Sequence, residues 1–232
     1  MAGKKYKKAL QQLDRSKTYL LPDAVNVVQQ LPKAGFDETV ELSMHLNVDP
    51  RQSDQMIRGT VPLPHGSGKN VVVVVFAKAG PEAEAAKEAG AEHVGFDELI
   101  KKCTGGWTGF DVAIATPAAM SEVRKLGKIL GPRGLMPNPK TGTVTTDTAK
   151  AVQEVKAGRV EFKVDKGANI HIAVGKASFA AEKLVENAMT AIEAIYKSRP
   201  SSVKGGFVKS CTVSKTMSPS VYLDLKTLMN AA

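Results

Sequence analysis

The chain has 232 residues, and its 32 Lys and Arg outnumber its 23 Asp and Glu, which gives a formal net charge of +9. This basic excess favours a polyanionic partner such as nucleic acid, while a hydrophobic share of 43% excludes a wholly disordered chain. Aromatic residues make up only 5%, too few for the base-stacking surface of a typical reader of single-stranded nucleic acid.

The sequence offers no sign of a secreted, metal-binding or membrane protein. Cys103 and Cys211 lie far apart without CxxC spacing, so neither a disulfide framework nor a zinc site is indicated. The longest apolar run, residues 71–77, is far too short to cross a bilayer. We therefore expect a cytoplasmic protein with no membrane contact, no cofactor and no metal.

The N-terminal and middle parts of the chain carry different strand patterns. Residues 39–46 alternate in polarity, as in a strand with one solvated face, whereas residues 71–76 are continuously apolar, as in a strand buried on both faces. After these we expect a helix at 81–89, a strand at 93–95, a helix at 97–102, a strand at 110–115 and a helix from Pro117 to about residue 126. Alternating strands and helices of this kind predict a parallel sheet covered by helices.

The C-terminal part returns to alternating strands. Residues 159–164 and 170–174 are predicted to pair as a hairpin across residues 166–168. Ser178 is expected to cap a long amphipathic helix, and two further strands are expected at 206–214 and 220–225. The helix has one apolar stripe, formed by Leu184, Val185, Ala188, Ile192 and Ile195.

Neither flank of the chain has enough sheet to close a core alone. We therefore predict one discontinuous α+β sandwich built from residues 1–67 and 160–232, with residues 68–159 as an inserted Rossmann-like α/β domain. The chain crosses between the two domains near several Pro and Gly residues, which indicates a hinge.

A Rossmann-like domain raises the possibility of a nucleotide-dependent enzyme. The turn after the apolar strand, residues 77–81, lacks GxGxxG. Residues 66–70, Gly-Ser-Gly-Lys-Asn, lack the Ser or Thr that follows the Lys in a Walker A loop, and they precede a strand when they should follow one. The four histidines are scattered without ligand spacing. A fold analogy alone is no evidence of a reaction, so we expect a protein that is not an enzyme.

The segment 131–143 has three prolines and three glycines, and Arg133 and Lys140 lie within it. Two interpretations stay open: a rigid connector at the domain interface, or a loop whose exposed backbone amides grip phosphate. Residues 124–140 and 197–215 are each basic with no acidic residue, which suits phosphate contact.

Four stretches, residues 53–66, 131–143, 170–179 and 215–220, resemble signatures of the ribosomal protein L-one (uL-one) family, the stalk protein of the bacterial large ribosomal subunit. The resemblance implies the two-domain layout and binding to 23S ribosomal RNA, which forms the mobile stalk beside the tRNA exit site. It also implies assistance in releasing exit-site tRNA, and repression of the protein's own operon through its leader mRNA. Off the ribosome, the protein is expected to be a monomer.

The resemblance also implies which residues contact RNA. The primary candidates are Phe36, Thr39, Lys166, His171, Lys176, Ser178, Thr216, Met217 and Ser218, with Arg133 and Lys140 as secondary candidates. Each of these residues also has a structural alternative, for example Phe36 as a cap on the core, Thr39 as a plain strand former and His171 as an ordinary surface or core residue. Met217 lies in a polar loop and is harder to explain as a core residue.

Three positions depart from the family pattern: Lys215 stands where the family usually has Thr, Ser218 where it has Gly, and Met56 where it has Asn. Glycine adopts positive φ and lets RNA approach the backbone closely, which serine does less easily. Either the loop bends differently here, or the Ser218 hydroxyl bonds to a phosphate or a 2′-OH. The replacement at Met56 puts any polar contact there in doubt.

Overall fold

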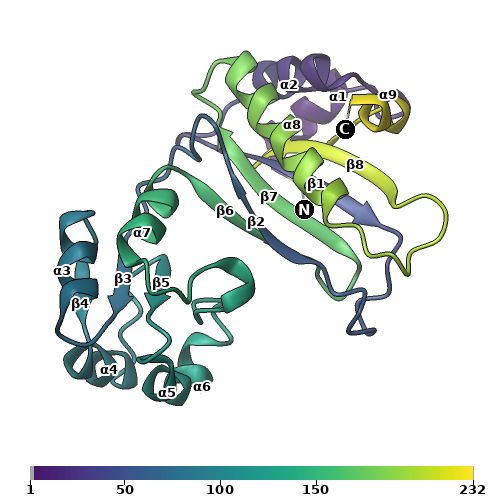
Figure 1. Ribbon diagram of the computed structural model, residues 1–232. Helices are drawn as coiled ribbons and strands as arrows, with labels where there is room; N and C mark the ends of the chain where they lie inside the picture. Colours follow the sequence, from purple (N-terminus) through teal and green to yellow (C-terminus); the bar gives the residue numbers. More distant parts are fainter. Residues whose placement is uncertain (1–2, 232) are drawn as a thin grey trace. The chain divides into compact units, whose positions relative to one another are not determined.

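The computed structural model describes residues 3–231. The chain divides into two compact units: the chain up to Gly68 together with the chain from Val160 onward (the discontinuous unit), and Lys69–Arg159 (the inserted unit). An antiparallel sheet forms in the first and a parallel sheet in the second (Figure 1), which confirms the predicted fold class. Within the described residues, no helix is both long and apolar enough to span a membrane.

The discontinuous unit contains a four-stranded antiparallel sheet in the order β7-β1-β8-β9 and a separate pair of strands, β2 and β6. The strands are β1 (Thr39–Leu46), β2 (Arg58–Pro62), β6 (Arg159–Lys163), β7 (Asn169–Lys176), β8 (Val208–Lys215) and β9 (Val221–Tyr222). The helices are α1 (Lys4–Gln12), α2 (Leu21–Gln30), α8 (Ala181–Lys197) and α9 (Leu225–Ala231).

The core of this unit lies between the sheet and helices α2 and α8, which pack on each other and on one sheet face (Figure 1). Alternate residues of β1 are buried, as the sequence pattern predicts. The apolar stripe of α8 is confirmed as well: Leu184, Ala188, Ile192 and Ile195 are fully buried, and Val185 is partly buried against them. Full burial of a leucine or isoleucine side chain such as Leu184, Ile192 or Ile195 stabilises the fold by about 1.5–3 kcal/mol.

The predicted hairpin of residues 159–164 with 170–174 is wrong. Strand β7 pairs antiparallel with β1, with Ser43 opposite His171, while β6 pairs with β2. The turn between β6 and β7 is closed by Asp165, whose carboxylate accepts hydrogen bonds from the backbone amides of Gly167 (2.8 Å) and Asn169 (2.7 Å). Alternation shows which face of a strand is buried, but it does not identify the partner strand.

Two predicted helix starts also differ. Helix α8 begins at Ala181 with Ala180 as its N-cap, and the Ser178 hydroxyl donates instead to the Asp37 carboxylate at 2.8 Å. The helix expected from Pro117 begins later and is broken into three short segments, α5 (Met120–Val123), η1 (Arg124–Leu126) and α6 (Gly127–Leu130).

The inserted unit has three parallel strands in the order β4-β3-β5: β3 (Val73–Phe76), β4 (His93–Gly95) and β5 (Val112–Ala115). Its other helices are α3 (Pro81–Glu88), α4 (Asp97–Thr104), η2 (Pro139–Thr141) and α7 (Thr148–Lys156). Every residue of β3 is buried, because its side chains belong to two apolar clusters. Val74 and Phe76 pack toward α4, α5 and α6, while Val73 and Val75 pack toward α3 and α7.

Candidate nucleic-acid interface

One end of the antiparallel sheet gathers seven of the nine primary candidates. Thr39, at the start of β1, lies opposite Lys176 at the end of β7, and the next residue, Val40, lies opposite Lys215 at the end of β8. Three strand ends and the loops that flank them therefore meet at one place, which we call the candidate site. It comprises Phe36, Thr39, Lys176, Ser178, Thr216, Met217 and Ser218.

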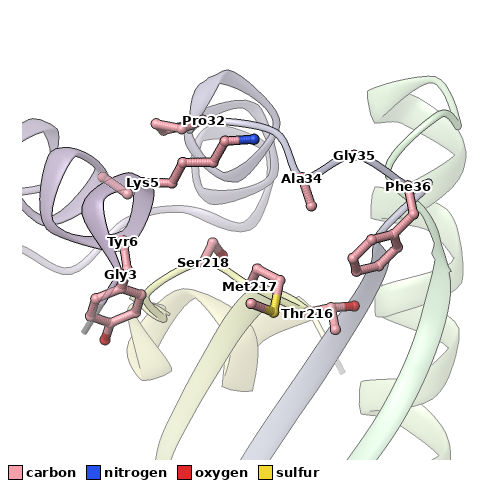
Figure 2. A pocket seen from close by; sticks show the side chains of 11 residues that line it. Gly3, Lys5, Tyr6, Pro32, Ala34, Gly35, Phe36, Thr216, Met217 and Ser218 are labelled. Carbon is pink, nitrogen blue, oxygen red and sulfur yellow. The ribbon is translucent and has the colours of Figure 1, made fainter. Parts of the chain in front are cut away.

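A groove of about 540 Å³ opens beside these residues. Figure 2 shows Phe36 at one end of the groove, Tyr6 of α1 at the other, and Met217 between them. The side chains of Phe36 and Met217 are 57% and 62% exposed, so neither belongs to the core. Large apolar side chains held in the open in this way indicate a contact surface.

A buried ion pair lies directly beneath the groove. Lys215 and Glu38 are only 2% and 1% exposed, and the Lys215 ammonium lies 3.8 Å from the Glu38 carboxylate. The ammonium also donates to the Leu31 carbonyl at 2.9 Å, and the carboxylate accepts from the amides of Ala34 and Met217, each at 3.1 Å. Burial lowers the pKa of Lys215, while the Glu38 charge acts in the opposite direction. These two charged groups tie together the end of α2, the loop before Phe36 and the turn that carries Met217.

The turn at residues 215–218 is closed from within. Its Ser218 hydroxyl accepts from the Lys215 amide at 2.8 Å, and the Ser218 amide donates to the Lys215 carbonyl at 3.0 Å. Among the described residues, Ala168 is the one non-glycine residue with a positive φ, so this turn does not require a glycine at Ser218. The loop therefore accommodates the departure from the family pattern, and the serine hydroxyl is engaged within the turn.

Thr216 holds the turn against strand β1. Its hydroxyl accepts from the Thr39 amide at 3.0 Å, and its own amide donates to the Thr39 carbonyl at 3.1 Å. The Thr39 hydroxyl in turn accepts from the Lys176 ammonium at 3.0 Å. Thr39 is therefore more than a strand former, because it fixes the position of a cation at the sheet edge.

Two primary candidates lie away from this cluster. His171 is exposed in the middle of β7, where its ring nitrogen Nδ1 is 2.9 Å from the Ser43 hydroxyl. Lys166 lies in the turn before β7, at the opposite end of the strand from Lys176, and lines a separate hollow with Met56. The structure therefore does not bring Lys166 to the candidate site.

The two secondary candidates, Arg133 and Lys140, lie in the inserted unit and are exposed. Arg133 donates to the Thr108 hydroxyl. Several backbone amides of the 131–143 loop are bonded inside the loop, for example the amide of Thr143 to the Asn138 carbonyl. Amides used in this way cannot grip phosphate, which counts against that interpretation for the 138–143 part of the loop.

Sequence reasoning missed the contribution of α1 and of Glu38. Lys5 and Tyr6 line the groove, although neither was among the candidates. The signal in the sequence was the run of lysines at positions 4, 5, 7 and 8. Glu38 directly precedes β1. Its burial follows from extending the alternation of β1 back by one residue, which puts Glu38 on the same face as the buried Val40.

The inserted unit has a hollow of its own at one end of its parallel sheet. The hollow at the carboxyl ends of β3 and β4 is lined by Lys78, Lys87, Asp97 and Glu98 among others. Among residues 3–231, no group of three or more His, Cys, Asp or Glu side chains could hold a metal ion.

Comparison with known proteins shows the family of this chain. The model of the ribosomal protein L1p/L10e family matches residues 28–219. Relatives named "Large ribosomal subunit protein uL1" include one from Lactobacillus delbrueckii subsp. bulgaricus, 54% identical over 98% of each chain. Another from Clavibacter michiganensis is 53% identical over 97% of this chain and 99% of its own, and one from Chlorobium luteolum is 55% identical over 95% and 96%. This chain belongs to the ribosomal protein L1p/L10e family.

Proposed function

We propose that this protein is a component of the large ribosomal subunit in the cytoplasm and that it binds 23S ribosomal RNA through the candidate site. The observation that carries the proposal is the pair of exposed apolar side chains, Phe36 and Met217, held on a rigid frame beside hydroxyl and ammonium groups. The names of the relatives, which cover nearly the whole chain, support assignment to the large subunit.

The site suits recognition of RNA by shape. The deep major groove of an RNA helix excludes side chains, so folded RNA is read through its backbone, its 2′-OH groups and its irregular loops. Thr39, Thr216 and Ser218 are small and already fixed by internal hydrogen bonds, so little conformational entropy is lost when RNA docks on them. Phe36 and Met217 supply the apolar contact to sugars or bases.

Electrostatic attraction adds affinity without sequence preference. If about five lysines and arginines neutralise phosphates, the log–log slope of affinity against salt is on the order of −3 to −5. Lys176 is one such group, and Arg133 and Lys140 add to it from the inserted unit. Binding that hardly changes with salt would contradict this part of the proposal.

The resemblance to the stalk protein supports a finer assignment. We propose that the bound RNA forms the mobile stalk beside the tRNA exit site, and that the protein assists release of exit-site tRNA. The leader mRNA of its own operon would bind the same candidate site, and the protein would be a monomer off the ribosome. Crosslinking in cells followed by sequencing of the bound RNA tests this: recovery of ribosomal RNA alone would refute the repressor role.

The direct test is truncation of the two exposed apolar side chains. Phe36→Ala should weaken binding of a stalk-region 23S fragment by about 1–3 kcal/mol, the range found for lost base–aromatic contact. Met217→Ala should weaken binding as well, because its exposed side chain lies in the same groove. Thermal unfolding should move little, because both side chains lie outside the core. Leu20→Ala is the matched control, since Leu20 is 49% exposed and does not line the groove. Equal affinities for all three variants would refute the site.

A second test asks which unit carries specificity. Replacing residues 69–159 by a short Gly-Ser linker should leave a folded protein, because the paired strands β2 and β6 hold the two chain ends near each other. Residues up to Gly68 are retained because Asn187 bonds the amide of His65 and the carbonyl of Gly66. The shortened protein should still prefer stalk RNA to an unrelated duplex. Selectivity that travels with the 69–159 fragment would overturn the assignment.

A further inference from the structure

The candidate residues line only part of the groove, and helix α1 forms another of its walls. Its residues Lys5 and Tyr6 line the same groove as Phe36 and Met217 (Figure 2). The helix is fixed in place, because Ala9 is buried and the Lys5 ammonium donates to the Lys33 carbonyl at 3.0 Å. The groove is therefore bounded by aromatic rings at both ends, contributed by segments 30 residues apart in the sequence.

The outer surface of the same helix is basic. Lys4, Lys7 and Lys8 are exposed, and none of them takes part in an ion pair among the described residues. The first acidic residue of the chain is Asp14, and it pairs with its neighbour Lys17. Uncompensated positive charge on this helix, next to an apolar groove, is complementary to a ligand that joins a flat apolar ring to a phosphate.

We propose that α1 and the groove form an additional RNA subsite that takes one unpaired nucleotide of the RNA bound at the candidate site. The base lies against Met217 with the rings of Tyr6 and Phe36 on either side, and Lys4, Lys7 and Lys8 contact the adjoining phosphates. The inference rests on the proposed function, since the same RNA must be held by the candidate site.

The chemistry of the groove favours an unpaired nucleotide over a duplex. Bases in a duplex are stacked on each other, whereas a base in a loop or bulge is free to stack on protein side chains. The groove volume of about 540 Å³ falls in the range of sites that enclose small organic ligands. Two aromatic rings and a thioether give a base apolar contact on several sides without selecting its identity.

The first experiment separates stacking from packing at Tyr6. Tyr6→Leu removes the ring but keeps apolar volume, and it should weaken binding of a stalk-region 23S fragment by between about fivefold and 100-fold. Tyr6→Phe keeps the ring and should bind within about twofold of the unchanged protein. Loss of affinity in both variants, or in neither, would overturn the stacking role.

The second experiment measures the charges on α1. The triple variant Lys4→Gln, Lys7→Gln, Lys8→Gln should lower the magnitude of the salt slope by about 2–3, taking roughly 0.7–0.9 per phosphate contact. The control carries the same charge change on exposed lysines of the inserted unit, Lys87→Gln, Lys101→Gln and Lys102→Gln. Because all six side chains are exposed, neither triple variant should alter folding. Equal slopes for the two triple variants would overturn the phosphate contact.

The third experiment locates the RNA directly. Cys103 and Cys211 are buried, so an exposed cysteine introduced on α1 by Gln11→Cys can carry a hydroxyl-radical-generating iron chelate selectively. Cleavage of the bound RNA should centre on unpaired nucleotides, and Glu88→Cys on α3 should give a different pattern. If the unchanged protein fails to bind the fragment, the proposed function fails. If it binds and Gln11→Cys gives no cleavage at unpaired nucleotides, only the α1 subsite is wrong.

Discussion

Removal of the buried ammonium by Lys215→Met provides a sharp test of how the site is built. At a separation of 3.8 Å and an effective dielectric constant of 20, the attraction between Lys215 and Glu38 is about 4 kcal/mol, much of which offsets the cost of burying both charges. Removing one partner leaves the other charge buried alone, which typically costs about 3–5 kcal/mol. Glu38 keeps two backbone hydrogen bonds, so we expect a loss near the lower end, about 3 kcal/mol.

The distribution of aromatic residues makes the assay specific for each unit. The single tryptophan, Trp107, lies in the inserted unit, whereas all four tyrosines, at positions 6, 19, 196 and 222, lie in the discontinuous unit. In urea unfolding of Lys215→Met, the tyrosine signal should shift to lower urea concentration and the Trp107 signal should stay. RNA affinity, measured where the variant is fully folded, should also fall, because the turn that carries Met217 loses part of its anchor.

A double variant shows whether the lost stability comes from the unpaired Glu38 charge. Lys215→Met with Glu38→Gln buries no charge, so its loss of unfolding free energy should be smaller than the sum of the two single losses by about 1–3 kcal/mol.

A pH series adds an independent check. Burial lowers the pKa of Lys215 below its ordinary value of 10.5, so the unfolded chain binds this proton more tightly. The free energy of unfolding of the unchanged protein should therefore exceed that of Lys215→Met by a growing amount as pH rises from the folded-state pKa of Lys215 toward 10.5. Additive losses, or a loss below about 1 kcal/mol, would refute the reasoning.

Three further predictions concern other contacts. In the inserted unit the hydrogen bond from Lys69 lowers the pKa of Asp111, so Asp111→Asn should reduce stability at neutral pH, and the difference should vanish in urea titrations as pH falls through the folded-state pKa. The Tyr196 hydroxyl is buried without a hydrogen-bond partner in the described structure, so Tyr196→Phe should leave thermal stability unchanged or raise it by up to about 1 kcal/mol. Ser218→Gly removes the acceptor of the Lys215 amide and should cost about 1 kcal/mol in urea unfolding; tighter RNA binding would instead mark Ser218 as a tolerated defect.

Local pattern predicted much of the fold. The strand expected at 39–46 is β1, and the one expected at 93–95 is β4, because alternation and β-branched runs report directly on burial. Partners across long separations were not predictable in the same way. The Ser178 hydroxyl stood at a plausible helix start, but its acceptor is Asp37, 141 residues earlier in the chain. A hydroxyl near a helix start can hydrogen-bond to a distant carboxylate as readily as to the backbone of the helix. The local sequence does not distinguish these two hydrogen bonds.

The sequence named candidate residues that lie together in the structure, but it did not predict the contacts that hold them in place. The family resemblance indicated Phe36, Thr216 and Met217, and the structure brings all three to one groove. The resemblance did not indicate which charged groups hold these residues in place, because a lysine in a polar turn is normally assumed to be solvated. Lys166 lies away from the other candidates, because a matching position in the sequence does not place a residue beside the others, and its contact with RNA stays a prediction.

The buried ion pair nevertheless follows from strand geometry once the sheet is known. Cys211, Val213 and Lys215 alternate along β8, so Lys215 must share the core face with the other two. Glu38 stands two residues before Val40 on the core face of β1, and the register sets Val40 opposite Lys215. A charge at either position alone would be buried without an ionic partner, which is costly. The Lys215 side chain instead extends within the core to the Glu38 carboxylate, 3.8 Å away. We accordingly expect Lys215→Thr to leave Glu38 less well compensated in this chain, a loss that urea unfolding followed through the tyrosine signal would measure.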